Sequence, residues 1–179
     1  MRKWVFLLVM GWFTSVSYGQ INPELMQAIA SHYYKNERPV VKGRWYHLYL
    51  FDTISVLPLP IAESLLSEHP DRIKQLRAAN LQAKDARTWD QLLEAFPEGL
   101  RKKMGTPHSL EQFHAMLEQR TTQHPYLLVV FTPYRVSENE YIAIVRHFRN
   151  SEHQKEEVAV WKRQNGQWRY AEQLYFYKP

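Results

Sequence analysis

The chain has 179 residues, no cysteine and a net charge of +5 at pH 7, which comes from 23 basic and 18 acidic side chains. Without cysteine it has no disulfide, no thiol nucleophile and no zinc site built on thiolates. The small positive charge argues against a nucleic-acid partner, because phosphate-binding proteins gather many Lys and Arg side chains on one face.

The first 19 residues have the layout of a secretory signal peptide. Arg2 and Lys3 form a short positive region, residues 4–13 are apolar, and Ser17 and Gly19 precede a cleavage site at Gln20. The apolar run is shorter than the roughly 20 residues that a membrane-spanning helix needs. We therefore expect cleavage and export to the periplasm or the extracellular space, with no membrane span in the mature chain. An uncleaved segment that anchors the protein is the alternative.

The mature chain expected after cleavage, residues 20–179, is predicted to form a single domain. Cleavage removes two basic residues and no acidic one, so the net charge falls to +3. The remaining 160 residues are enough to bury one hydrophobic core without the help of disulfides.

A helix and a strand are the first predicted elements of the mature chain. Asn22 and Pro23 mark the start of the helix, since Asn caps free N–H groups and Pro suits the first helical position. The strand covers residues 40–56, which are rich in β-branched and aromatic side chains. Apolar side chains alternate onto both of its faces, so we expect the strand to be covered on both sides.

A long helical segment follows this strand. Residues 61–104 carry apolar side chains at the helical period, and Pro70 marks one helix start within them. Thr88 and Ser109 are each followed three residues later by Gln, which is the spacing of a capping box. We therefore expect two further helices to begin at Thr88 and Ser109.

The last third of the chain is predicted to form strands. Its apolar stretches are separated by short polar connectors, which favours antiparallel neighbours. The predicted strands cover residues 126–132, 140–148, 156–163 and 167–177. We therefore predict an α+β fold, in which a curved antiparallel sheet of about four or five strands packs against the N-terminal and central helices.

Asn165 and Gly166 mark the turn of the last hairpin, because both residues tolerate positive φ. Two registers are open. A two-residue turn pairs Trp161 with Tyr170 and Arg163 with Trp168. A three-residue loop with a glycine bulge pairs Val160 with Tyr170 and Lys162 with Trp168, and this slip changes which face each aromatic ring shares with its neighbours.

The stretch from Val158 to Phe176, VAVWKRQNGQWRYAEQLYF, resembles the C-terminal hairpin of the NTF2-like superfamily, also called cystatin-like or SnoaL-like. Many members end in an apolar strand, an Asn-Gly or Asp-Gly turn, and a strand that opens on Trp. The resemblance implies a cone-like roll with a cavity between the sheet and the helices. Members include isomerases, hydratases, cyclases, non-catalytic ligand binders and exported assembly components, so the fold alone implies no activity.

Three residues are candidates for acid–base chemistry. His47 and His147 fall within predicted strands, where each is either a general acid or base facing a cavity or a hydrogen-bonded structural residue. Asp52 ends the first predicted strand, where it acts as a base beside a tyrosine or bonds the local backbone. None of the eight histidines forms a metal-binding pair at helical spacing, so we expect no metal and no cofactor.

Four aromatic residues are candidates for a ligand or partner surface. They are Tyr49, Trp161, Trp168 and Tyr170. Such rings pack in a core or on a sheet, and they also stack on a sugar ring or a partner chain. In the hairpin, Lys162 and Arg163 point to opposite faces, so they do not make one dense basic patch.

These features favour an exported domain without catalysis. It binds a small apolar ligand in a cavity or pairs with an envelope or secreted protein. A small isomerase or hydratase with its acid–base site in the cavity is the alternative, and a membrane-anchored component of a secretion machinery is a second one. We also expect a homodimer through the outer face of the sheet.

Overall fold

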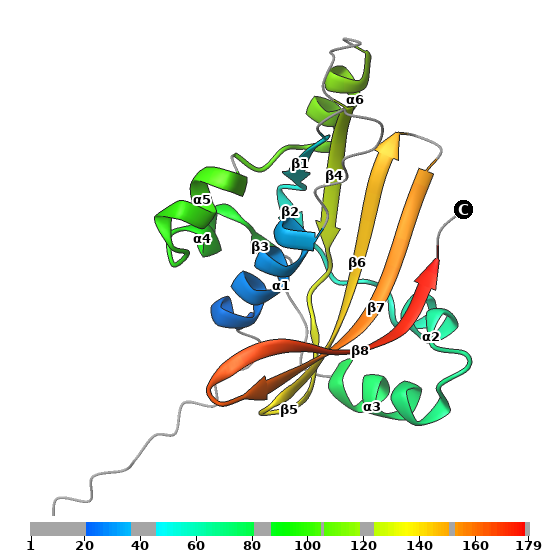
Figure 1. The fold of residues 1–179 in the computed structure, drawn as a ribbon. Helices are drawn as coiled ribbons and strands as arrows, with labels where there is room; N and C mark the ends of the chain where they lie inside the picture. The colour runs from blue at the N-terminus through cyan, green and yellow to red at the C-terminus, as the bar shows by residue number, and fades with distance from the viewer. Residues whose placement is uncertain are drawn as a thin grey trace, which may run out of the picture.

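The computed structural model describes residues 21–36, 46–80, 87–104, 106–118, 124–150 and 153–177. The predicted signal peptide and its cleavage site lie outside these ranges. Helices lie on both sides of one large sheet, as Figure 1 shows. In the part of the chain that is described, no helix is long and apolar enough to cross a membrane.

The elements follow the chain in the order helix, strands, helices, strands. They are α1 Pro23–Asn36, β1 Tyr46–Leu50, β2 Thr53–Ile54, α2 Leu59–Leu65, α3 Pro70–Asn80, β3 Arg87–Thr88, α4 Asp90–Leu93, α5 Glu98–Met104, α6 Leu110–Glu118, β4 His124–Val130, β5 Tyr134–Ser137, β6 Glu140–Asn150, β7 His153–Gln164 and β8 Gln167–Tyr177. The predicted α+β class is confirmed, and so is the sheet packed against helices.

The large sheet has the strand order β1-β4-β6-β7-β8, and β5 also pairs with β6. Strands β4 to β8 pair antiparallel, whereas β1 runs parallel to β4. The order leaves β1 and β8 at the two edges, so the sheet is open. It is neither closed nor strongly curled, in contrast to the cone-like roll that the resemblance implied.

The strand predicted over residues 40–56 is interrupted near Asp52. Its first part, residues 40–45, lies outside the described ranges, and β1 ends at Leu50. The backbone N–H of Asp52 donates to the carbonyl of His108, and its carbonyl accepts from Trp89. These bonds take the chain out of the large sheet, so Thr53 and Ile54 pair with β3 in a separate two-stranded sheet.

The two predicted capping boxes have different outcomes. At Ser109, Gln112 Oε1 accepts from the Ser109 backbone N–H at 2.9 Å and Ser109 Oγ accepts from the Gln112 N–H at 3.2 Å, so this prediction is confirmed. The prediction at Thr88 is wrong. Thr88 pairs with Thr53 in β3, and α4 begins at Asp90 without a side-chain cap.

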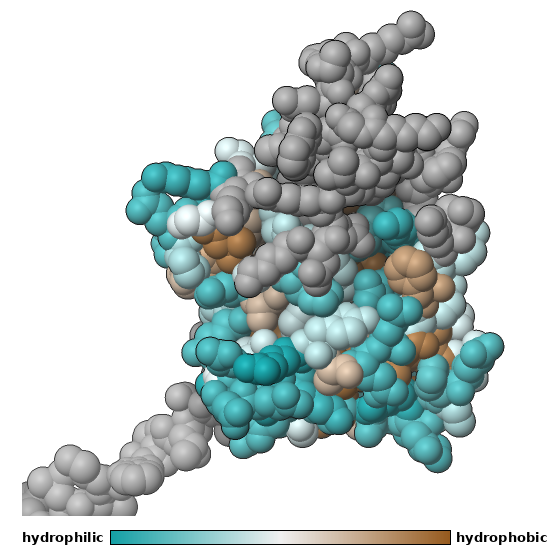
Figure 2. All heavy atoms as spheres, viewed as in Figure 1, coloured by the Kyte–Doolittle hydropathy of each residue, from teal (hydrophilic) through white to brown (hydrophobic). Residues whose placement is uncertain are grey.

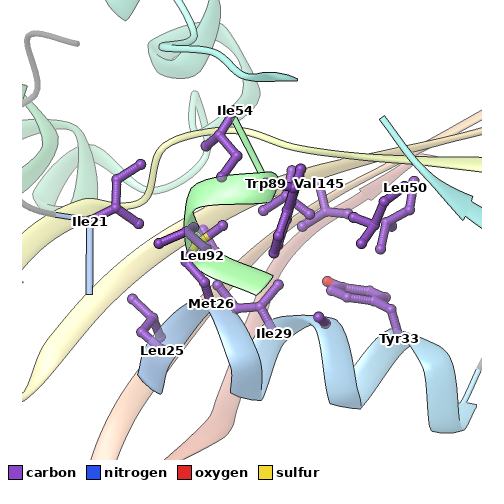
Figure 3. Close-up of a cluster of buried hydrophobic side chains, with 14 of the residues drawn as sticks. Ile21, Leu25, Met26, Ile29, Tyr33, Leu50, Ile54, Trp89, Leu92 and Val145 are labelled. Carbon is purple, nitrogen blue, oxygen red and sulfur yellow. The ribbon is translucent and has the colours of Figure 1, made fainter. Parts of the chain in front are cut away.

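Helix α1 covers one face of the sheet. Its start is confirmed, because Asn22 Oδ1 accepts from the Leu25 backbone N–H at 3.1 Å. Met26, Ile29 and Tyr33 point from α1 toward Trp89 and the sheet (Figure 3). We name this set the α1 core; its buried residues are Ile21, Leu25, Met26, Ile29, Ala30, Tyr33, Leu50, Ile54, Trp89, Leu92, Phe96, Met104, Leu128, Val130, Ala143, Val145, Ala159, Trp161 and Trp168.

Helices α2 and α3, with Phe113 of α6, cover the opposite face. Alternation along β6 divides the two faces, since Ala143 and Val145 belong to the α1 core, and Ile142 and Ile144 do not. We name the second set the α2–α3 core; its buried residues are Leu57, Ala62, Leu66, Leu76, Ala79, Phe113, Leu127, Val129, Phe131, Tyr134, Ile142, Ile144, Val158, Val160 and Leu174. Both faces of the central strands are therefore filled with side chains.

The β7–β8 hairpin adopts the first of the two predicted registers. Gln164 pairs with Gln167, which leaves Asn165 and Gly166 as a two-residue turn with φ of 51° and 77°. Trp161 consequently lies opposite Tyr170, and Arg163 opposite Trp168. The turn type fits the right-handed twist of the two strands, because both of its central residues have positive φ.

Candidate functional site

An aromatic cluster joins α1 to the last strands of the sheet. The His32 ring stacks on Tyr170 with centroids 4.6 Å apart and meets the edge of Trp161 at 5.5 Å. One residue further along α1, Tyr33 contacts His147 of β6, with ring centroids 5.1 Å apart. The structure therefore brings together three residues that the sequence singled out separately: His147, Trp161 and Tyr170.

Tyr170 and Glu157 form the most polar pair of this cluster. The Tyr170 hydroxyl donates to Glu157 Oε1 at 2.7 Å. Burial, this hydrogen bond and the charge of Glu157 all raise the pKa of Tyr170. The phenol therefore stays protonated at neutral pH, and it acts as a fixed donor to the carboxylate.

Three of the seven predicted site residues are buried. His147 and Trp161 are each 1 % exposed, and Trp168 is 7 % exposed. Among the described residues, the indole N–H groups of Trp161 and Trp168 have no acceptor, and both rings pack in the α1 core. The aromatic cluster thus fastens α1 to the sheet.

The other three predicted residues lie toward the β1 edge. The backbone N–H and carbonyl of Asp52 bond to the distant residues His108 and Trp89, and the two roles predicted for its side chain stay predictions. His47 and Tyr49 lie in β1, opposite Pro125 and Leu127 of β4. Their side chains are outside the described part of the structure, so their predicted roles stay predictions.

A polar groove lies at the opposite end of α1 from His32 and Tyr33. We name it the hairpin groove. It is lined by residues 21–24 at the start of α1, by Arg135, Glu138, Asn139 and Tyr141 around the β5–β6 turn, and by Arg163 of β7. Its volume is about 630 Å³. Figure 1 places the start of α1, β5 and the tip of the β7–β8 hairpin at the same end of the molecule, and Figure 2 shows hydrophilic side chains gathered there.

Main-chain bonds hold the walls of the hairpin groove in place. The backbone N–H of Arg163 donates to the carbonyl of Asn139 at 2.9 Å, which ties the hairpin to the β5–β6 turn. Behind the groove, Tyr141 meets Trp168 edge to face at 5.2 Å. Burial raises the pKa of Tyr141, and the charge of Arg135 opposes part of that rise. The groove is therefore a concave polar site built on rigid strands.

The lining of the hairpin groove favours hydrogen bonding and ion pairing. It carries two arginines and two glutamates, and Asn22 and Asn139 add amide groups. Within the described ranges, no group of three His, Asp or Glu side chains is placed to hold a metal ion. The site is thus suited to binding a polar ligand or a polypeptide segment.

The sequence did not single out Arg135, Glu138 or Tyr141. Their place in one groove depends on contacts between distant parts of the chain, such as the ion pair between Arg163 and Glu24, which are 139 residues apart. The one local signal was the Asn-Gly turn, since it fixes the register that sets Arg163 opposite Trp168. No family model, curated protein or solved structure matches the chain.

Proposed function

We propose that this protein is an exported binding domain that engages another envelope or secreted protein through the hairpin groove. The proposal rests on one contrast within the molecule. Side chains fill both faces of the central strands, whereas the hairpin groove is a concave surface at the rim of the sheet. Sites for small apolar ligands are lined mainly by apolar and aromatic groups, and the polar lining of this groove is of a different kind.

The partner we propose is a different protein rather than a second copy of the chain. A dimer through the outer face of the sheet needs that face to be open. In this chain α2, α3 and Phe113 cover it, and Leu66, Leu76 and Phe113 are buried there. Among the described residues, the hairpin groove lies at the rim of the sheet, outside this covered face, and we propose it as the partner surface.

Site-specific photocrosslinking in cells that export the protein tests this proposal. The crosslinker replaces Asn139, whose backbone makes the groove bonds and whose side chain is exposed, or Ala78, which is exposed on α3. We expect a covalent adduct with a second protein from position 139 and none from position 78. Equal adducts from both positions, or an adduct from position 78 alone, would overturn the proposal.

A further inference from the structure

The two arginines of the hairpin groove are held loosely by acidic partners of their own chain. Arg163 Nη2 lies 3.3 Å from Glu24 Oε2, and Arg135 Nη2 lies 4.0 Å from Glu138 Oε1. Arginines elsewhere are held more closely, with 2.6 Å from Arg72 to Glu140 and 2.7 Å from Arg77 to Glu63. Of these four described arginines, the two with the longer ion-pair distances, Arg135 and Arg163, are thus the two that line the groove.

The acidic partners in the groove are also easy to displace. The side chains of Glu24 and Glu138 are 66 % and 88 % exposed, so solvent screens their attraction to the arginines. Arg163, in contrast, has its guanidinium carbon 6.0 Å from the centre of the Trp168 ring. A nearly buried ring therefore supports the cation, while the opposing carboxylate is free to move into water.

Arg135 and Arg163 approach the groove from different strands. Arg135 belongs to β5 and Arg163 to β7, and both of these strands are hydrogen-bonded to β6. The start of the 14-residue helix α1 also lines the groove and adds the positive end of its dipole. Two guanidinium groups beside a helix start make a site for an anionic group, and guanidinium binds carboxylates through paired hydrogen bonds.

We infer that the hairpin groove binds an acidic segment of the partner protein, with a carboxylate of that segment displacing Glu24 from Arg163 and Glu138 from Arg135. This inference rests on the proposed function, because it names the chemistry that the partner presents. The carboxylate belongs either to an Asp or Glu side chain or to the partner's C-terminus. Both sources offer the same two oxygens to the arginine pair.

NMR titration of the full exported chain, labelled with ¹⁵N, tests the inference and separates the two sources. The first probe is a short peptide of alternating Glu and Ala with an amidated C-terminus. The second replaces Glu by Gln and keeps a free C-terminal carboxylate, and the third replaces Glu by Gln with an amidated terminus. We expect the amide signals of Asn139 and Arg163 to shift with the first or the second probe and not with the third.

Three charge variants locate the binding site. Arg163→Gln is expected to weaken binding of the carboxylate probe by about tenfold, which corresponds to the loss of one charge-assisted pair. Arg101→Gln removes an equal charge from the exposed face of α5 and is expected to leave the affinity unchanged. Glu24→Gln removes the internal competitor and is expected to strengthen binding, a gain that a damaged fold does not produce.

Two results would overturn the inference. One is an equal loss of probe affinity in Arg163→Gln and Arg101→Gln, which would mean that the probe responds to the net charge of the protein and not to the groove. The other is no shift at Asn139 and Arg163 with either carboxylate probe. If the crosslink from position 139 forms in spite of this second result, the proposed function stands and only the chemistry assigned to the partner is wrong.

Discussion

Replacing Tyr134 by Phe removes one buried hydroxyl and tests how the α2–α3 core is held. The Tyr134 hydroxyl donates to the carbonyl of Leu57 at 2.7 Å and thereby ties β5 to the segment before α2. Tyr134 is 1 % exposed, so the variant leaves that carbonyl buried without its donor. We expect the free energy of unfolding to fall by about 1–2 kcal/mol at pH 8.

The same hydroxyl gives the wild-type protein a pH dependence that the variant lacks. Burial raises the pKa of Tyr134 from the usual 10.0 to about 12. Folding therefore favours the protonated phenol, so its stabilisation is complete below pH 10 and is lost as the pH rises from 10 toward 12. At pH 11 the wild type has lost about 1.4 kcal/mol through this group. The stability gap between the two proteins should narrow by that amount.

Urea unfolding followed by tryptophan fluorescence measures this gap. Both proteins are unfolded at pH 8, 9, 10 and 11, and only the difference between them is interpreted. The other ionisable groups are the same in both proteins, so their contributions cancel in the difference. A gap that stays constant from pH 8 to pH 11, or that widens, would refute the reasoning.

Four further substitutions test the α1 core, the hairpin turn, helix α5 and the cap of α6, each by urea unfolding. Trp161→Ala should lower the free energy of unfolding by about 3–5 kcal/mol, and a loss below about 1 kcal/mol would contradict its place in the α1 core. Gly166→Ala should lower the free energy of unfolding by about 1–2 kcal/mol, because Gly166 has φ of +77°, although nothing lies within 4 Å of an added Cβ. Gly99→Ala, in α5, should raise the free energy of unfolding by about 0.5–1 kcal/mol. Equal effects of the two substitutions would contradict the assignment of positive φ to Gly166 alone of this pair. Ser109→Ala should lower the free energy of unfolding by about 1 kcal/mol, because it removes the cap of α6. An unchanged free energy of unfolding would contradict the capping box.

Features that depend on neighbouring residues were predictable from the sequence. Asn22 caps α1, and Ser109 with Gln112 caps α6, because a short polar side chain reaches the backbone of its own turn. The Asn165–Gly166 turn follows equally from local φ preferences. The sequence left two registers open for that turn, since the choice between them depends on how both strands pack.

Features that depend on distant contacts were not predictable. Thr88 has the spacing of a capping box, yet its backbone pairs with Thr53, which lies 35 positions earlier in the chain. A tertiary pairing thus overrode a local preference. The sequence left the hairpin aromatics open between a core and a binding surface; Trp161 and Trp168 are buried in the α1 core, and Tyr170 packs against it half-buried. The hairpin groove combines residues from three parts of the chain, and the Asn-Gly turn is the one local pattern that bears on it.

Native mass spectrometry of the protein purified from its native cells tests the central claim most directly, because one measured mass reports signal cleavage, a bound ligand and a bound partner together. We predict a chain that begins at Gln20 and is bound to one other protein. We also predict that Arg163→Gln weakens this complex and that Arg101→Gln does not. A chain that carries only a small bound molecule, or that pairs only with itself, would contradict the account.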